Sequence, residues 1–89
     1  MICREITIIN KLGLHARAAA KLVSTASAFS SQIKVGYKDR MVDGKSIMAV
    51  MMLAASKGTE ILLHADGSDA EAAVEALADL INRRFDEDE

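Results

Sequence analysis

The sequence predicts an α+β fold in which helices cover one face of a four-stranded antiparallel sheet. Segments with the two-residue alternation of strands and the wider spacing of amphipathic helices follow one another in the order βαββαβα. With 89 residues, the chain is too short for helices to cover both faces of such a sheet. An antiparallel sheet can leave one face open to water, so it is the economical arrangement. We therefore expect one domain over residues 1–89.

The first third of the chain predicts a strand, a turn and a helix. Isoleucines alternate with polar residues over residues 2–9, as in a half-buried strand. Gly13 supplies backbone freedom for a turn over residues 10–14. Apolar residues at helical spacing then predict an amphipathic helix over residues 16–28.

The middle third predicts a hairpin followed by a short helix. Residues 32–37 alternate like a strand, and a tight turn leads into a second short strand over residues 40–43. Ser46 is a favourable N-cap for a helix over residues 47–55. Gly58 would close that helix.

The last third predicts a strand and a longer helix. Residues 59–66 alternate between apolar and polar side chains. Ser68 and Glu71 have the spacing of a capping box for a final helix over residues 69–84. The acidic tail over residues 86–89 is expected to fray.

Composition and charge exclude several classes of protein. Hydrophobic residues make up 51% and charged residues 27%, as in an ordinary globular domain. The net charge of −2 gives no general attraction to nucleic acid or to a membrane surface. The longest apolar run, over residues 47–55, is far shorter than the ~20 residues of a membrane span. No basic segment followed by an apolar run precedes the first strand, so we expect no signal peptide and a cytoplasmic protein.

Cysteine and histidine usage argues against a metal or redox centre. Cys3 is the only cysteine, which excludes an internal disulfide and a CxxC clip, and we expect it to be a partly buried thiol. His64 lies within a predicted strand, on the side opposite the core, without a second ligand at metal-binding spacing. Gly44, Lys45 and Ser46 resemble the end of a nucleotide-binding phosphate loop, but that loop requires glycine at position 39, which is Asp39. We expect neither a metal nor a cofactor.

His15 is the strongest candidate for chemistry. If a helix begins at Ala16, His15 occupies the cap position, next to backbone N–H groups that lack partners inside the helix. Those donors and the helix dipole favour an anion, and Arg17 adds a guanidinium. A nucleophilic imidazole in this setting suits a phosphoryl group, although a surface histidine that merely caps a helix is the alternative. The sequence positions no second histidine or buried carboxylate to act with His15, so we expect no self-contained catalysis.

Methionines concentrate on the predicted short helix. A helix of this length buries one face, so its apolar side chains cannot all point inward. Exposed methionines form an adaptable surface that can serve several partners. We expect this surface to continue onto the leucines that flank the His15 turn. Its candidate docking residues are Leu12, Leu14, Ile47, Met48, Met51 and Met52.

Two motifs resemble those of a known family. Residues 10–17, Asn-Lys-Leu-Gly-Leu-His-Ala-Arg, resemble the active-site segment of the histidine-containing phosphocarrier family, HPr. Residues 43–48, Asp-Gly-Lys-Ser-Ile-Met, resemble the family's second signature, around its regulatory serine. The Asn-Lys-Leu-Gly opening and the Phe-Asp-Glu-Asp ending at residues 85–88 look more like the nitrogen-related branch, NPr, than the sugar-transport branch. Ala18 stands where family members commonly carry proline, which the first turn of a helix tolerates but does not require.

The resemblance implies an open-faced β-sandwich, with three helices on one side of the sheet. It also implies that His15 accepts a phosphoryl group on Nδ1 from phosphorylated enzyme I and passes it to a histidine of a IIA-type protein, in regulation or in sugar transport. Arg17 and the backbone N–H groups of Ala16 and Arg17 would stabilise the phosphate. The phosphohistidine would be an intermediate of transfer, and no independent turnover is expected.

The resemblance further implies docking and regulatory roles for residues outside the His15 turn. Lys21 and Lys45 would face acidic surfaces of the partners, and a monomer is expected. Ser46 becomes a candidate for phosphorylation by a dedicated serine kinase and for removal of that phosphate by a phosphorylase. A phosphate there would add about two negative charges beside the docking residues and weaken binding to acidic partners.

Two alternatives to a carrier stay open. The chain could be a regulatory protein-binding module controlled by phosphorylation of Ser46, but relatives that cannot be phosphorylated lack the histidine that His15 supplies here. A small metal carrier of βαββαβ type is disfavoured by the missing CxxC motif.

Overall fold

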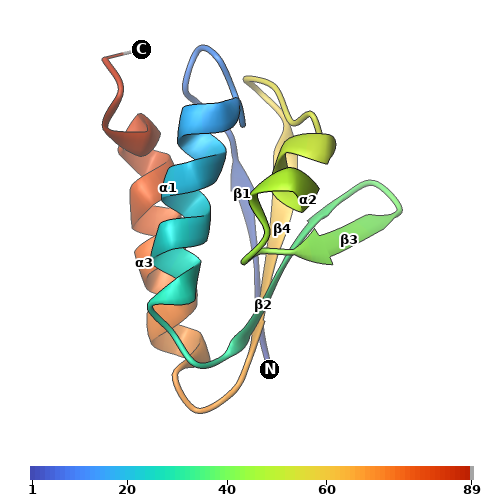
Figure 1. Ribbon diagram of the computed structural model, residues 1–89, viewed down its shortest axis with the longest axis vertical. Helices are drawn as coiled ribbons and strands as arrows, with labels where there is room; N and C mark the ends of the chain where they lie inside the picture. The colour runs from blue at the N-terminus through green and yellow to red at the C-terminus, as the bar shows by residue number, and fades with distance from the viewer. Residues whose placement is uncertain (89) are drawn as a thin grey trace.

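A computed structural model describes residues 1–88 and confirms the α+β class, with the four strands in one antiparallel sheet (Figure 1). The strand order across the sheet is β1-β4-β2-β3. The first and last strands of the sequence are therefore neighbours, with β1 at one edge of the sheet, and β3 of the β2–β3 hairpin forms the other edge. All three neighbouring pairs are antiparallel. The strands are β1 (Ile2–Thr7), β2 (Gln32–Tyr37), β3 (Arg40–Asp43) and β4 (Glu60–Asp66).

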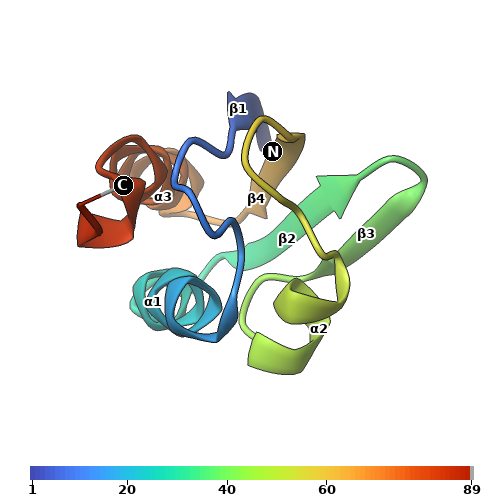
Figure 2. The ribbon, with the colours of Figure 1, turned by 90° about the horizontal axis from the view of Figure 1, so that it is seen from above.

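The helices lie on one side of this sheet, as an open-faced sandwich requires. Figure 2 shows the three α-helices on the same side and the opposite face of the sheet uncovered. The core between the layers is aliphatic except for Phe85, which is fully buried. The helical elements are α1 (Ala16–Ser27), α2 (Ile47–Met52), α3 (Ala70–Asn82) and a 3₁₀ turn, η1 (Arg84–Asp86). Within residues 1–88, no helix has the length and hydrophobicity needed to cross a bilayer.

The alternation of the strands places their apolar residues in this core. Ile33 and Val35 of β2 are buried, and so are Ile61, Leu63 and Ala65 of β4. The intervening side chains face the open side of the sheet. Cys3 is on that side, opposite His64, and is exposed instead of partly buried as expected, because its strand turns Ile6 and not Cys3 toward the helices.

Two predicted element ends differ in the structure. Helix α2 ends at Met52 instead of near residue 55, because Ala54 adopts a left-handed backbone with φ 54°. Helix α3 has Asp69 as its N-cap, so the predicted Ser68–Glu71 capping box is wrong. Asp69 lies there because its carboxylate accepts a hydrogen bond from the N–H group of Ser31, the residue directly before β2.

Candidate functional site

His15 occupies the N-cap of α1, as predicted. Its backbone is extended (φ −75°, ψ −179°), and its carbonyl accepts the first helical hydrogen bond from Ala19 N–H at 2.8 Å. Its side chain makes no capping hydrogen bond. The N–H groups of Ala16 and Arg17 consequently find no acceptor among residues 1–88. The start of α1 therefore presents free N–H donors beside an imidazole that makes no capping hydrogen bond.

The turn before His15 is tightly packed against the end of α2. Gly13 has φ +65°, and a Cβ atom there would lie 2.4 Å from the carbonyl oxygen of Ala55. That oxygen accepts a hydrogen bond from Leu14 N–H at 2.9 Å. Asn10 is fully buried and donates from Nδ2 to the Gly13 carbonyl at 2.8 Å. Only glycine fits this position, and the packing fixes where His15 leaves the turn.

Leu14 is buried by the same packing, with 4% of its surface exposed. Its predicted place among the exposed docking residues is therefore wrong. The hydrogen bond from Leu14 N–H to the Ala55 carbonyl holds this part of the turn against the segment after α2, and the leucine side chain belongs to the hydrophobic core. Leu12, on the other side of Gly13, is exposed as predicted.

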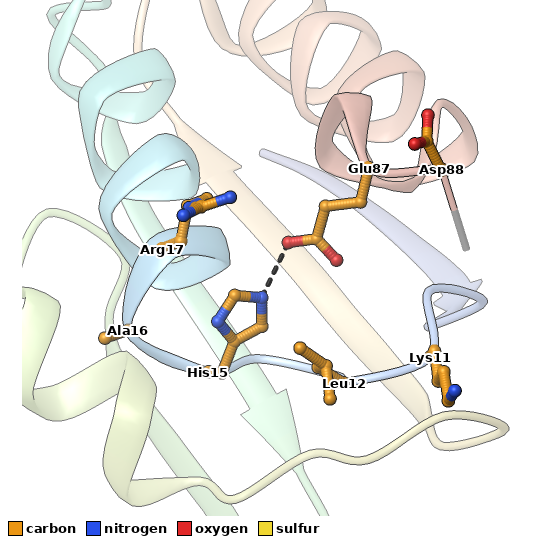
Figure 3. Close-up of a pocket in the computed structure, with 7 residues that line it drawn as sticks. All are labelled: Lys11, Leu12, His15, Ala16, Arg17, Glu87 and Asp88. Carbon is orange, nitrogen blue, oxygen red and sulfur yellow. Dashed lines mark hydrogen bonds and ion pairs between the residues drawn. The ribbon is translucent and has the colours of Figure 1, made fainter.

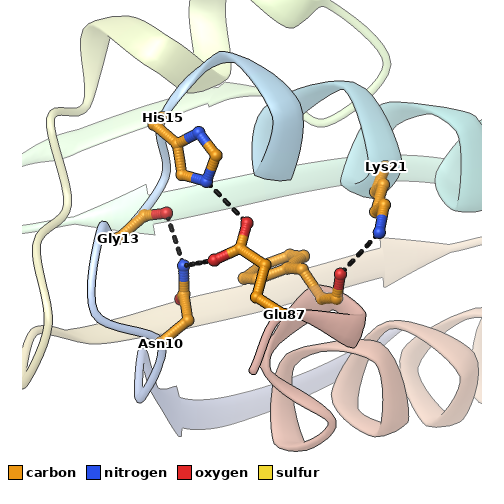
Figure 4. A network of polar contacts seen from close by, with 6 residues as sticks. Asn10, Gly13, His15, Lys21 and Glu87 are labelled. Atoms are coloured by element: carbon orange, nitrogen blue, oxygen red, sulfur yellow. Dashed lines mark hydrogen bonds and ion pairs between the residues drawn. The ribbon is translucent and has the colours of Figure 1, made fainter. Parts of the chain in front are cut away.

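Glu87 contacts His15 directly, a contact that no pattern in the sequence predicts. Its Oε2 lies 2.6 Å from His15 Nε2, and its Oε1 accepts a hydrogen bond from Asn10 Nδ2 at 3.1 Å (Figure 4). Burial raises the pKa of the Glu87 carboxyl. The hydrogen bonds from His15 and Asn10, the charge of His15 in its protonated form and the charge of Lys21 outweigh this effect, so the pKa lies below its usual value. The local sequence around Glu87 is only a run of acidic residues after Phe85, which by itself indicates no contact.

Asp86 and Glu87 are held by side-chain contacts to Arg83 and His15, so the predicted fraying of the tail is wrong for these two residues. Glu89 lies outside the described residues. Phe85 is fully buried in the core. Its carbonyl accepts a hydrogen bond from Lys21 Nζ at 2.7 Å. The C-terminal strap, residues 84–88, is therefore held at one end by the core and at the other by His15.

An open cleft of about 750 Å³ lies between the strap and the start of α1 (Figure 3). His15 is at its base, and the exposed Arg17 is at its edge, with no ion pair to any of residues 1–88. The cleft thus brings together the predicted histidine, the predicted arginine and the free N–H groups, and it is wide enough for a partner's side chain. Its lining consists of Lys11, Leu12, His15, Ala16, Arg17, Glu87 and Asp88.

An exposed apolar patch adjoins this cleft, on α2 and the His15 turn. Met48 is the most exposed of its residues, at 72%. Helix α2 lies beside α1 in both ribbon views, so the patch and His15 share one end of the molecule (Figures 1 and 2). The patch consists of Leu12, Ile47, Met48, Met51 and Met52.

Two predicted docking lysines are bonded to backbone carbonyls. Lys21 Nζ donates to Phe85, and Lys45 Nζ donates to Phe29 at 2.7 Å. Both side chains are half-buried. Ser46 caps α2 as predicted, with its Oγ accepting a hydrogen bond from Ala49 N–H at 3.3 Å.

Within residues 1–88, no three His, Cys, Asp or Glu side chains lie together in a way that could hold a metal ion. His64, the second histidine, is half-buried on the sheet, with Nε2 against the sulfur of Met1. It is not among the residues that line the His15 cleft.

Known proteins resemble this chain both in sequence and in fold. Residues 2–83 match the family model described as the PTS HPr component phosphorylation site. The phosphocarrier protein HPr of Pseudomonas putida is 62% identical over 90 residues, covering 100% of both chains. The phosphocarrier protein NPr of Shewanella violacea is 42% identical, covering 94% of this chain and 92% of its own. The structure of HPr-C-His from Thermoanaerobacter tengcongensis superposes with a TM-score of 0.96 at 49% identity, covering 100% of both chains.

These matches identify a class of protein that carries phosphoryl groups on a histidine-containing β-sandwich. The chain belongs to the HPr family of phosphocarriers of the phosphotransferase system.

Proposed function

We propose that this chain accepts a phosphoryl group on His15 Nδ1 from phosphorylated enzyme I and passes it to a histidine of a IIA-type protein. The observation that carries the proposal is the imidazole at the start of α1, beside free N–H groups and Arg17 in an open cleft. Helix N-termini and guanidinium groups favour phosphoryl oxygens. Neither His15 nor Arg17 is enclosed, so both transfers would take place in complexes with the partners.

The modest strength of this anion site suits a carrier. Interactions with a helix terminus are worth ~0.3–1 kcal/mol at exposed positions. A much stronger phosphate site would hold the phosphoryl group and oppose onward transfer. We infer that the chain acts as a cytoplasmic monomer, and we assign it to the nitrogen-related branch from residues 10–13 and 85–88.

The direct test is phosphorylation with enzyme I and labelled phosphoenolpyruvate. The wild-type chain should yield an acid-labile phosphoprotein, and His15→Ala should yield none. His64→Ala is the matched control, because it removes the other histidine and should be labelled normally. Arg17→Ala should be labelled roughly tenfold more slowly without loss of the fold, as expected for one charge-assisted hydrogen bond. Labelling of His15→Ala would refute the proposal.

Phosphorylation of Ser46 is a second, regulatory proposal, favoured by the position of this serine at the start of α2 beside the apolar patch. Ser46→Asp keeps a capping oxygen but adds a negative charge, so we expect unchanged stability and severalfold weaker binding to enzyme I. Ser46→Asn is the control, because asparagine also caps a helix but carries no charge. Equal affinities of the two variants in calorimetric titration would contradict the regulatory role.

A further inference from the structure

We propose that Glu87 is a positioning residue for phosphoryl transfer: its carboxylate keeps a proton on Nε2 of His15, so that Nδ1 offers its lone pair to phosphorus. The inference rests on the proposed carrier function and deepens it. It concerns a residue beyond the 2–83 segment that matches the family model.

The contact itself assigns the two ring nitrogens. A carboxylate only accepts hydrogen bonds, so at 2.6 Å from Glu87 Oε2 the His15 Nε2 must be the donor. A neutral imidazole carries one proton, and the nitrogen without it holds a free lone pair. That nitrogen is Nδ1, which has no hydrogen-bond partner among residues 1–88.

Both oxygens of the Glu87 carboxylate make a hydrogen bond, and these two bonds fix its orientation. Oε1 is held by Asn10 Nδ2 at 3.1 Å while Oε2 faces the imidazole (Figure 4). Asn10 is itself buried and bonded to the turn that carries His15. The side chain of Glu87 is only 14% exposed, so water competes weakly for it. Its lowered pKa is consistent with an ionised carboxylate at neutral pH.

The backbone of the strap is strained in the three residues directly before Glu87. Arg84, Phe85 and Asp86 have φ values of 57°, 54° and 62°, all in the left-handed region that non-glycine residues rarely adopt. Each such residue costs roughly 1–2 kcal/mol. Burial of Phe85 and its bond to Lys21 oppose this cost. A strained backbone segment followed by a side chain that contacts the candidate phosphoryl acceptor is typical of a functional position.

The transfer step then needs no proton movement at the carrier. The Nδ1 lone pair forms the bond to phosphorus, while the bond from phosphorus to the enzyme I donor atom breaks and its electron pair stays with the donor. The proton remains on Nε2, so the ring becomes a phosphorylated imidazolium whose positive charge faces Glu87. In the second step the bond from Nδ1 to phosphorus breaks as the acceptor histidine attacks. Its electron pair returns to Nδ1, and the neutral ring with the same Nε2 proton is regenerated.

The test combines a spectroscopic and a kinetic readout on the full chain. With ¹⁵N-labelled histidine, the wild type should show a hydrogen-bonded Nε2–H proton of His15 that is protected from exchange with water. Glu87→Ala should lose that protected signal. In single-turnover transfer from phosphorylated enzyme I, it should lower the rate at saturating carrier roughly tenfold while leaving the half-saturating concentration unchanged.

Two further variants separate the hydrogen bond from charge alone. Glu87→Gln keeps an accepting oxygen and should retain part of the rate and of the protected signal. Glu71→Ala removes the same charge from an exposed residue in the first turn of α3, outside the cleft, and should match the wild type in both readouts.

The proposal is overturned if the wild-type proton resides on Nδ1, if Glu87→Ala transfers at the wild-type rate, or if the variant changes only the half-saturating concentration. The last result would make Glu87 a docking residue. Failure of the wild type to accept phosphate at all would instead refute the carrier function, because the nuclear magnetic resonance readout needs no partner.

Discussion

At the scale of single residues, Asp69 shows how one carboxylate joins segments that are distant in the sequence. It accepts hydrogen bonds from the N–H groups of Ser30 and Ser31, each at 2.9 Å, and from both serine hydroxyls. The hydrogen bonds from Ser31 and Ser30 lower the pKa of the carboxyl from 3.8 to about 2. Asp69 therefore ties the start of α3 to the start of β2.

The lowered pKa predicts an acid-dependent contribution to stability. Because the folded-state pKa lies below the unfolded one, the contribution is present in full above about pH 4 and is lost as the pH falls toward 2. Asp69→Asn should be less stable than the wild type at pH 7 and should lose less stability between pH 4 and pH 2. Urea denaturation at these pH values measures both effects. Asp88→Asn is the control, and a wild-type pH slope in Asp69→Asn would contradict the assignment.

At the scale of elements, the C-terminal strap contains three consecutive left-handed residues, Arg84, Phe85 and Asp86. Helix α3 ends at Asn82, and the chain then passes through three left-handed residues to return over the start of α1. The fully buried Phe85 anchors this return. The strap thus couples the core to the side chain that faces His15.

The anchoring role predicts a large effect of Phe85→Ala. Truncating a fully buried phenylalanine should lower the free energy of unfolding by roughly 3–5 kcal/mol and release Glu87 from His15. Phe85→Leu keeps most of the apolar volume and should cost less. Deleting residues 87–89 is the matched control, because it removes Glu87 but leaves the anchor. If Phe85→Ala costs no more than this deletion in urea denaturation, the strap is not anchored by the core.

At the scale of the whole molecule, the cleft at His15 and the exposed apolar patch lie at one end. The His15 cleft lies between α1 and the strap, and the apolar patch lies beside it on α2. The opposite face of the sheet is uncovered (Figure 2). A partner that contacts the patch would therefore also reach His15, which is the arrangement that a phosphoryl carrier needs.

This arrangement predicts that Met48→Ala raises the half-saturating carrier concentration for enzyme I severalfold, because Met48 is the most exposed residue of the patch. Its stability should change by less than ~0.5 kcal/mol, as expected for an exposed side chain. Met41→Ala is the control, since Met41 is also an exposed methionine but lies on the edge strand β3. Equal transfer kinetics of the two variants would exclude the patch as the docking surface.

Local patterns in the sequence were sufficient for the element order, the core faces of the strands, the helix start at Ala16 and the Ser46 cap. Each of these depends on residues a few positions apart, whose periodicity and capping chemistry are visible in the chain itself. The proximity of His15 and Arg17 follows for the same reason, because one is the N-cap and the other lies in the first turn of the same helix.

Contacts between distant segments account for what the patterns missed. Leu14 is buried because its N–H reaches Ala55, and the cap of α3 is Asp69 because that carboxylate reaches Ser31. Glu87 lies 72 positions from His15, and no periodicity links them. The candidate site at His15 could thus be predicted from its own segment. The carboxylate that contacts His15 could not, because only the burial of Phe85 in the folded chain brings the end of the sequence back to the start of α1.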